Sequence, residues 1–74
     1  MRLTELKDNQ VAHVVNMSRL PATTRKRLTV MGMLPGTEVM VVRRAPLGDP
    51  LQVRVRGVDL AIRKALAQDV EVQA

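Results

Sequence analysis

Two groups of side chains in this sequence have the types and spacing for binding chemistry. The first is Arg25-Lys26-Arg27, three adjacent cations placed just after Thr23, where the sequence predicts that a helix begins. The start of a helix carries a partial positive charge that disfavours cations, and a residue that breaks a local rule is often functional. We therefore treat Arg25, Lys26 and Arg27 as a candidate contact surface for an acidic protein face. The alternative interpretation is a solvated basic turn.

The second group is the loop from Ala45 to Pro50, in which Leu47 lies between Pro46 and Pro50. Two prolines restrict the loop, and a stiff loop that presents an apolar side chain loses little entropy on binding. Pro46 and Leu47 are therefore candidate contact residues near the tip of the loop. The alternative is a structural hairpin cap with Leu47 folded onto the protein.

Met33 and Leu34 complete the candidate contact residues because they follow the predicted helix end at Gly32 and are expected to be exposed. The triplet Met31-Gly32-Met33 also has the spacing of a thioether metal motif. Core packing is the better interpretation, with Met31 on the buried helix face and Met33 closing the helix end.

Catalytic and metal-binding patterns are missing. The chain has one histidine, His13, and no cysteine, so it lacks the imidazoles that a ferrous site typically needs. It has no P-loop and no nucleophile beside an oriented base. Paired catalytic carboxylates are not excluded by spacing, but a chain this small offers little pocket for them. We expect no enzyme activity, no metal site and no cofactor.

Length and charge limit the remaining classes of function. The chain has 74 residues, which we expect to form one domain over residues 1–74, with a net charge of +5 and no aromatic residue. A basic surface suits nucleic acid, anionic lipid or an acidic protein. Proteins that bind single-stranded nucleic acid usually stack the bases on aromatic rings, and this chain has none. The missing rings disfavour a nucleic-acid-binding barrel, which we keep as an alternative.

The expected localisation follows from two missing features, a signal peptide and a membrane-spanning stretch. The N-terminus has charges spaced through it and no apolar run typical of a signal peptide. No stretch reaches the ~18 apolar residues of a membrane span. We expect a cytoplasmic protein that meets a membrane only through a partner.

The elements that position these residues are predicted from periodicity and from turn residues. We expect strands over 11–17, 37–44 and 51–56, a last strand around Val70 and Val72, and helices over 23–31 and 60–67. Gly32 ends the first helix, and Asp59 caps the second. This mainly β pattern with two short helices predicts a small five-stranded β-barrel. Its expected core is Val11, Val15, Leu28, Met31, Val39, Val41, Val53, Val55, Ile62, Leu66 and Val70.

Two runs at this separation carry a family resemblance. They are Gly32-Met33-Leu34-Pro35-Gly36-Thr37, preceded by Arg27-Leu28, and Ala45-Pro46-Leu47-Gly48-Asp49-Pro50, followed later by Leu60-Ala61-Ile62-Arg63-Lys64. The chain resembles the FeoA family, the small cytoplasmic component of bacterial ferrous iron uptake, over nearly its whole length. Asn9 departs from the pattern where many members have glycine, but it tolerates the same backbone conformation.

The resemblance implies an SH3-like barrel and a non-enzymatic role. The implied partner is FeoB, a membrane transporter with a cytoplasmic GTP-hydrolysing domain, whose transport or GTP hydrolysis the chain would alter. A stand-alone relative of the SH3-like domain of metal-dependent repressors is the close alternative, although no helix-turn-helix is present and the chain begins at Met1. Self-association through a sheet edge or the Leu47 loop is also open.

Overall fold

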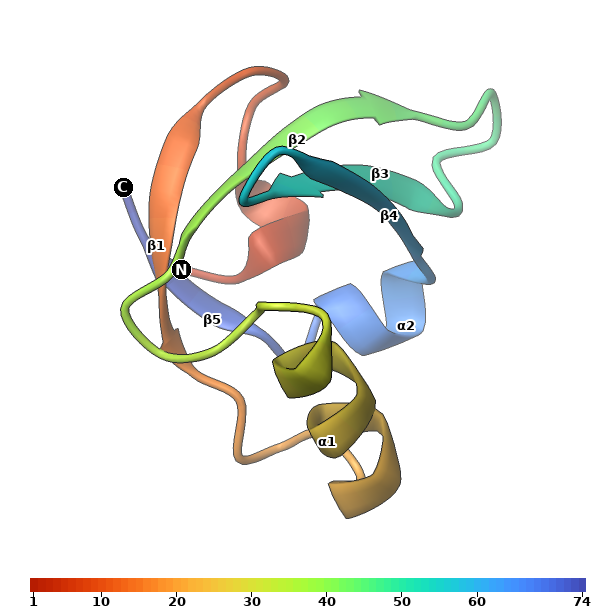
Figure 1. Cartoon of the computed structure of the whole chain (residues 1–74). Coiled ribbons are helices and arrows are strands. Elements are labelled where there is room, and N and C mark those ends of the chain that lie inside the picture. Colours follow the sequence, from red (N-terminus) through yellow and green to blue (C-terminus); the bar gives the residue numbers. More distant parts are fainter.

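A computed structural model describes all residues, 1–74. Its five strands form one antiparallel sheet in the order β4-β3-β2-β1-β5, which curves around the core (Figure 1). The strands are β1 (Val11–Asn16), β2 (Glu38–Arg44), β3 (Leu51–Val55), β4 (Val58–Ile62) and β5 (Glu71–Gln73). The helices are η1 (Leu3–Glu5, a 3-10 turn), α1 (Ala22–Val30) and α2 (Lys64–Ala67). The predicted five-stranded, mainly β architecture with two short helices is therefore present.

The core is wholly apolar and contains no aromatic ring. Its 18 buried residues include no polar or charged side chain, so folding leaves no ion or hydroxyl to be satisfied inside. The alternation predicted for Leu51, Val53 and Val55 is confirmed, because all three are 1% exposed or less. Leu28, Val39, Val41, Ile62 and Val70 are also buried as predicted, and Leu66 is partly buried against them.

Strand β1 has the opposite facing from the one predicted. Val11 and Val15 are 46% and 44% exposed, whereas Ala12 and Val14 are buried. The strand carries apolar residues on both faces, so composition does not decide which face is inside. Pairing decides it, because Val14 lies opposite Val72 of β5 and Ala12 opposite Val39 of β2. A shift of one residue exchanges the two faces of a strand.

The end of α1 follows the predicted signal closely. Gly32 has φ +103°, and its N–H donates to the carbonyl of Thr29 while the N–H of Met33 donates to that of Leu28. These two bonds make a Schellman motif, in which the residue after glycine packs back on the last helical turn. Met33 is accordingly 0% exposed, while Met31, predicted to be core, is 46% exposed.

Residues 58–62 form a strand where the sequence predicted the start of a helix. A two-residue turn, Arg56-Gly57, with φ of 53° and 81°, joins β3 directly to β4. Two positive φ values give the twist that a tight antiparallel hairpin needs. Asp59 therefore lies within β4 instead of capping a helix, and α2 covers only Lys64–Ala67.

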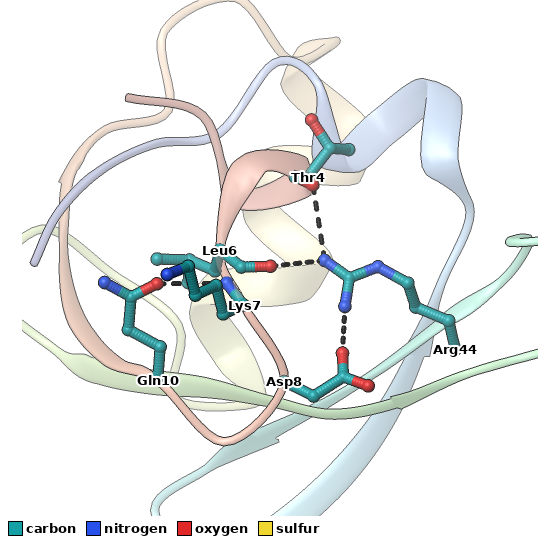
Figure 2. A network of polar contacts seen from close by, with 6 residues as sticks. All are labelled: Thr4, Leu6, Lys7, Asp8, Gln10 and Arg44. Carbon is teal, nitrogen blue, oxygen red and sulfur yellow. Dashed lines mark hydrogen bonds and ion pairs between the residues drawn. The ribbon is translucent and has the colours of Figure 1, made fainter.

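Arg44, at the end of β2, holds the N-terminal segment onto the sheet (Figure 2). Its guanidinium donates to the carbonyls of Thr4 and Leu6 and pairs with the Asp8 carboxylate. Asn9 adopts φ 65°, as its type allows, and donates its N–H to the carbonyl of Val41. The first ten residues are thus fixed over the barrel by hydrogen bonds as well as by Leu3 and Leu6.

A candidate interaction surface along β4

The predicted basic cluster lies on α1 and contributes to one wall of a groove. Lys26 and Arg27 are exposed, whereas Arg25 is half-buried and directs its Nη1 toward the carbonyl oxygens of Ser18 and Leu20, at 3.4 and 3.5 Å. None of the three makes an ion pair, since the two ion pairs of the protein lie elsewhere. The helix starts after Pro21 without a side-chain cap, so the cations at this end are not offset by a capping carboxylate.

The loop between β2 and β3 presents its leucine to solvent. Leu47 is 95% exposed, and two backbone bonds close the loop beneath it, from Gly48 to the carbonyl of Ala45 and from Ala45 to that of Pro50. The alternative of a leucine folded onto the barrel is wrong. Beside the loop lies a hollow of about 280 Å³, lined by Arg43, Ala45, Pro46, Pro50, Gln52, Asp59 and Ala61.

An apolar groove of about 280 Å³ lies between α1, β4 and α2. One stripe of α1 forms its first wall, with Thr24, Arg27, Leu28 and Met31 at the spacing of one helix face. Strand β4 forms the second wall, and Leu66 of α2 closes the end. The sequence does not predict this groove, because the expected core includes Met31 and the expected second helix covers residues 60–67.

The groove and the hollow beside the Leu47 loop meet at β4. Asp59 and Ala61 line both of them, so the sequence's two separate candidates, the α1 cluster and the loop, border one continuous surface. The signal that locates this surface is the turn Arg56-Gly57 between two valines, which identifies a hairpin. Arginine is uncommon at positive φ, so the sequence analysis does not predict this turn.

Asp59 is held in its charged form on this surface. Arg54 Nε donates to Asp59 Oδ1 at 2.8 Å, and Gln52 Nε2 donates to Oδ2 at 2.9 Å. The hydrogen bond from Arg54 is the main cause that lowers the pKa of Asp59 below its ordinary value. The same bond raises the pKa of Arg54. The pair leaves little net charge at the middle of β4.

Of the two other candidate contact residues, Leu34 has the exposure predicted and Met33 does not. Met33 is fully buried, so its assignment to a contact surface is wrong, because it closes the Schellman motif from inside. Leu34 is 37% exposed and stays a candidate. No three histidine or carboxylate side chains gather into a metal-ligating group. None of the helices is long and apolar enough to span a bilayer.

Comparison with known proteins identifies relatives over the whole chain. The family model for the FeoA domain matches residues 1–74. A Porphyromonas gingivalis protein, a fusion of Fe(2+) transport protein A with the Fe(2+) transporter FeoB, is 34% identical over 73 residues. That match includes 99% of this chain but spans only 8% of the length of the fusion protein.

Solved structures agree with the fold. The FeoA protein of Chlorobium tepidum is 36% identical, with a TM-score of 0.94 over 99% of this chain and 69% of its own. The FeoA protein of Stenotrophomonas maltophilia, a prokaryotic SH3 domain protein solved in complex with zinc, is 34% identical, with a TM-score of 0.84 over 99% of this chain and 89% of its own. The SH3-like barrel predicted from the sequence is confirmed, and the chain belongs to the FeoA domain family.

Proposed function

We propose that this chain is a non-enzymatic cytoplasmic adaptor of ferrous iron uptake. It binds the cytoplasmic, GTP-hydrolysing part of a FeoB-type membrane transporter and changes the rate of transport or of GTP hydrolysis. The observation that carries the proposal is the Porphyromonas gingivalis relative, in which a segment similar to this whole chain is joined covalently to a FeoB transporter. Joining two modules in one chain raises their effective concentration to the millimolar range, which favours even a weak contact.

The surface along β4 supports this role. It combines an apolar groove, exposed cations on α1 and a stiff loop that carries an exposed leucine, which together suit a protein partner better than a small substrate. The protein has a net charge of +5, so a partner with an acidic face would also associate faster.

The proposal is tested by titrating this protein against the full-length FeoB-type transporter of the same organism in lipid nanodiscs. The titration is run with and without a GTP analogue, at low and high salt, with empty nanodiscs as the control. Saturable binding that needs the transporter supports the adaptor. Strong weakening by salt assigns the contact to Arg25, Lys26 and Arg27, whereas binding insensitive to salt assigns it to Leu47. If the protein binds the transporter neither with nor without the GTP analogue, the proposal is contradicted.

A further inference from the structure

Strand β4 is an edge of the sheet, and two of its five residues have backbone N–H and C=O groups without a partner there. Ladder bonds alternate along an antiparallel strand, beginning here with the pair Val55–Val58 beside the two-residue turn. Asp59 and Ala61 occupy the intervening positions, so their N–H and C=O groups point away from β3. No strand pairs with that side of β4, and the hydrogen bonds outside the regular elements use none of these groups.

Natural proteins usually protect such an edge with lysine, proline, a bulge or a covering element. None of the first three occurs in Val58–Ile62, and the one charge, on Asp59, is paired with Arg54. The neighbouring element α1 buries only Leu28, and Figure 1 shows it set apart from the sheet on the side where β4 runs into α2. The residues that line the groove place α1 opposite the edge, as its other wall.

The lining of the groove is mostly apolar, with one arginine, Arg27, on the α1 wall. Leu28 and Leu60 form the floor, 8% and 6% exposed, and Met31 stands on the wall at 46%. Arg27 lines the groove, and three further cations without an ion-pair partner adjoin β4 along the chain: Arg56 in the β3–β4 turn, Arg63 directly after the strand and Lys64 at the start of α2. The nearby carboxylate of Asp49 accepts the backbone N–H of Lys64.

We propose that this groove takes an extended acidic segment of the transporter, which adds to the free edge of β4 as a sixth strand. The backbone of the segment would bond to Asp59 and Ala61, as in other complexes that extend a sheet. The inference rests on the proposed function for the identity of the partner. It adds the site on this chain, the conformation of the bound segment and the chemistry of its side chains.

The pleat of an added strand defines the sequence that fits. Five residues of β4 extend about 17 Å at ~3.4 Å per residue, so about five residues of the partner suffice. Alternate side chains point to opposite faces. Those on the α1 side meet Leu28, Met31 and Leu66, which selects aliphatic residues. Carboxylates flanking them meet Arg27 at one side and Arg63 at the end of β4, which selects Asp or Glu.

The test uses the full-length transporter in nanodiscs and three pairs of variants, each pair with a matched control. Met31→Asp places a charge in the groove, and Val30→Asp places it on the neighbouring residue outside the groove, where the side chain is 80% exposed. Ala61→Pro removes the outward N–H without touching the ladder to β3, and Ala61→Ser keeps that N–H. Arg27→Glu reverses a charge of the groove, and Arg19→Glu makes the same change in the separate hollow beside Arg2.

We expect Met31→Asp and Ala61→Pro to raise Kd at least about tenfold, since each affects the centre of the contact. Val30→Asp stays within about twofold because Val30 lies outside the groove, and Ala61→Ser raises Kd less than Ala61→Pro does because it keeps the outward N–H. Arg27→Glu lowers the affinity for the transporter more than Arg19→Glu does, and it also reduces the dependence of that affinity on salt more. Hydrogen exchange on the complex shows new protection of the Ala61 amide. Far-UV circular dichroism of every variant confirms that the fold is kept.

Three results overturn the inference in distinguishable ways. If the wild-type protein does not bind the transporter, the proposed function fails and the inference fails with it. If it binds, and Met31→Asp binds as well as Val30→Asp, the groove is not the site and the proposed function stands alone. If Met31→Asp weakens binding but folded Ala61→Pro does not, and Ala61 gains no protection, the partner packs on the groove without adding a strand.

Discussion

Truncation of Met33 is expected to cost much more stability than truncation of Met31, two residues away. Met33 is 0% exposed and Met31 is 46% exposed, so only the first change leaves a cavity in the core. Met→Ala at a fully buried site costs about 2–5 kcal/mol. A chain of 74 residues has a total stability of roughly 4–11 kcal/mol. Met33→Ala therefore removes a large share of it, whereas Met31→Ala should cost below about 1 kcal/mol, as exposed sites do.

The assay is urea unfolding followed by far-UV circular dichroism, because the chain has no Trp, Tyr or Phe to provide fluorescence. A small domain loses about 1 kcal/mol of stability per molar urea. At that slope Met33→Ala lowers the midpoint by about 2–5 M and Met31→Ala by less than about 1 M. Equal midpoints for the two variants would refute the assignment of Met33 to the core. They would also restore Met33 as a contact residue.

Three further predictions concern the polar contacts and the sheet edge. Arg44→Met should cost about 1–3 kcal/mol of stability in urea unfolding, because two carbonyls and a carboxylate lose a charged donor; an unchanged midpoint would contradict this. The lowered pKa of Asp59 means that its stabilising effect is present above its ordinary value of 3.8 and is lost as the pH falls through the lowered pKa. Asp59→Asn should therefore weaken the acid dependence of Tm; an unaltered dependence would argue against the pair with Arg54. In the free protein, the amide of Ala61 should exchange at least about tenfold faster than that of Leu60, measured by NMR; equal rates would reject the open edge.

Local chemistry in the sequence predicts some elements well. The Schellman motif at Gly32 and the alternation of Leu51, Val53 and Val55 are each set by a few neighbouring residues, and both are confirmed. The burial of Met33 belongs to the same motif, since the residue after the glycine normally packs back on the helix. Its assignment to the surface was an error of interpretation that the sequence itself corrects.

Pairing between distant residues decides what the sequence left open. In β1, valines occur on both faces, and the partners Val72 and Val39 choose Val14 and Ala12 for the core. A short apolar run such as residues 60–62 fits a strand or a helix equally. The open groove depends on how α1 stands beside β4, which no periodicity encodes. Only the cations and the exposed Leu47 of the candidate surface were predictable from the sequence.

Site-specific photocrosslinking in native membranes tests the central claim most directly. The chain has no cysteine, so one introduced thiol carries a single photoreactive label. Met31→Cys places the label in the groove, and Val15→Cys places it on β1, three strands away from β4, at a similarly exposed site. We expect a covalent adduct with the FeoB-type transporter from Met31→Cys and none from Val15→Cys. An adduct only from Val15→Cys would contradict the site, and no transporter adduct from either would contradict the adaptor role.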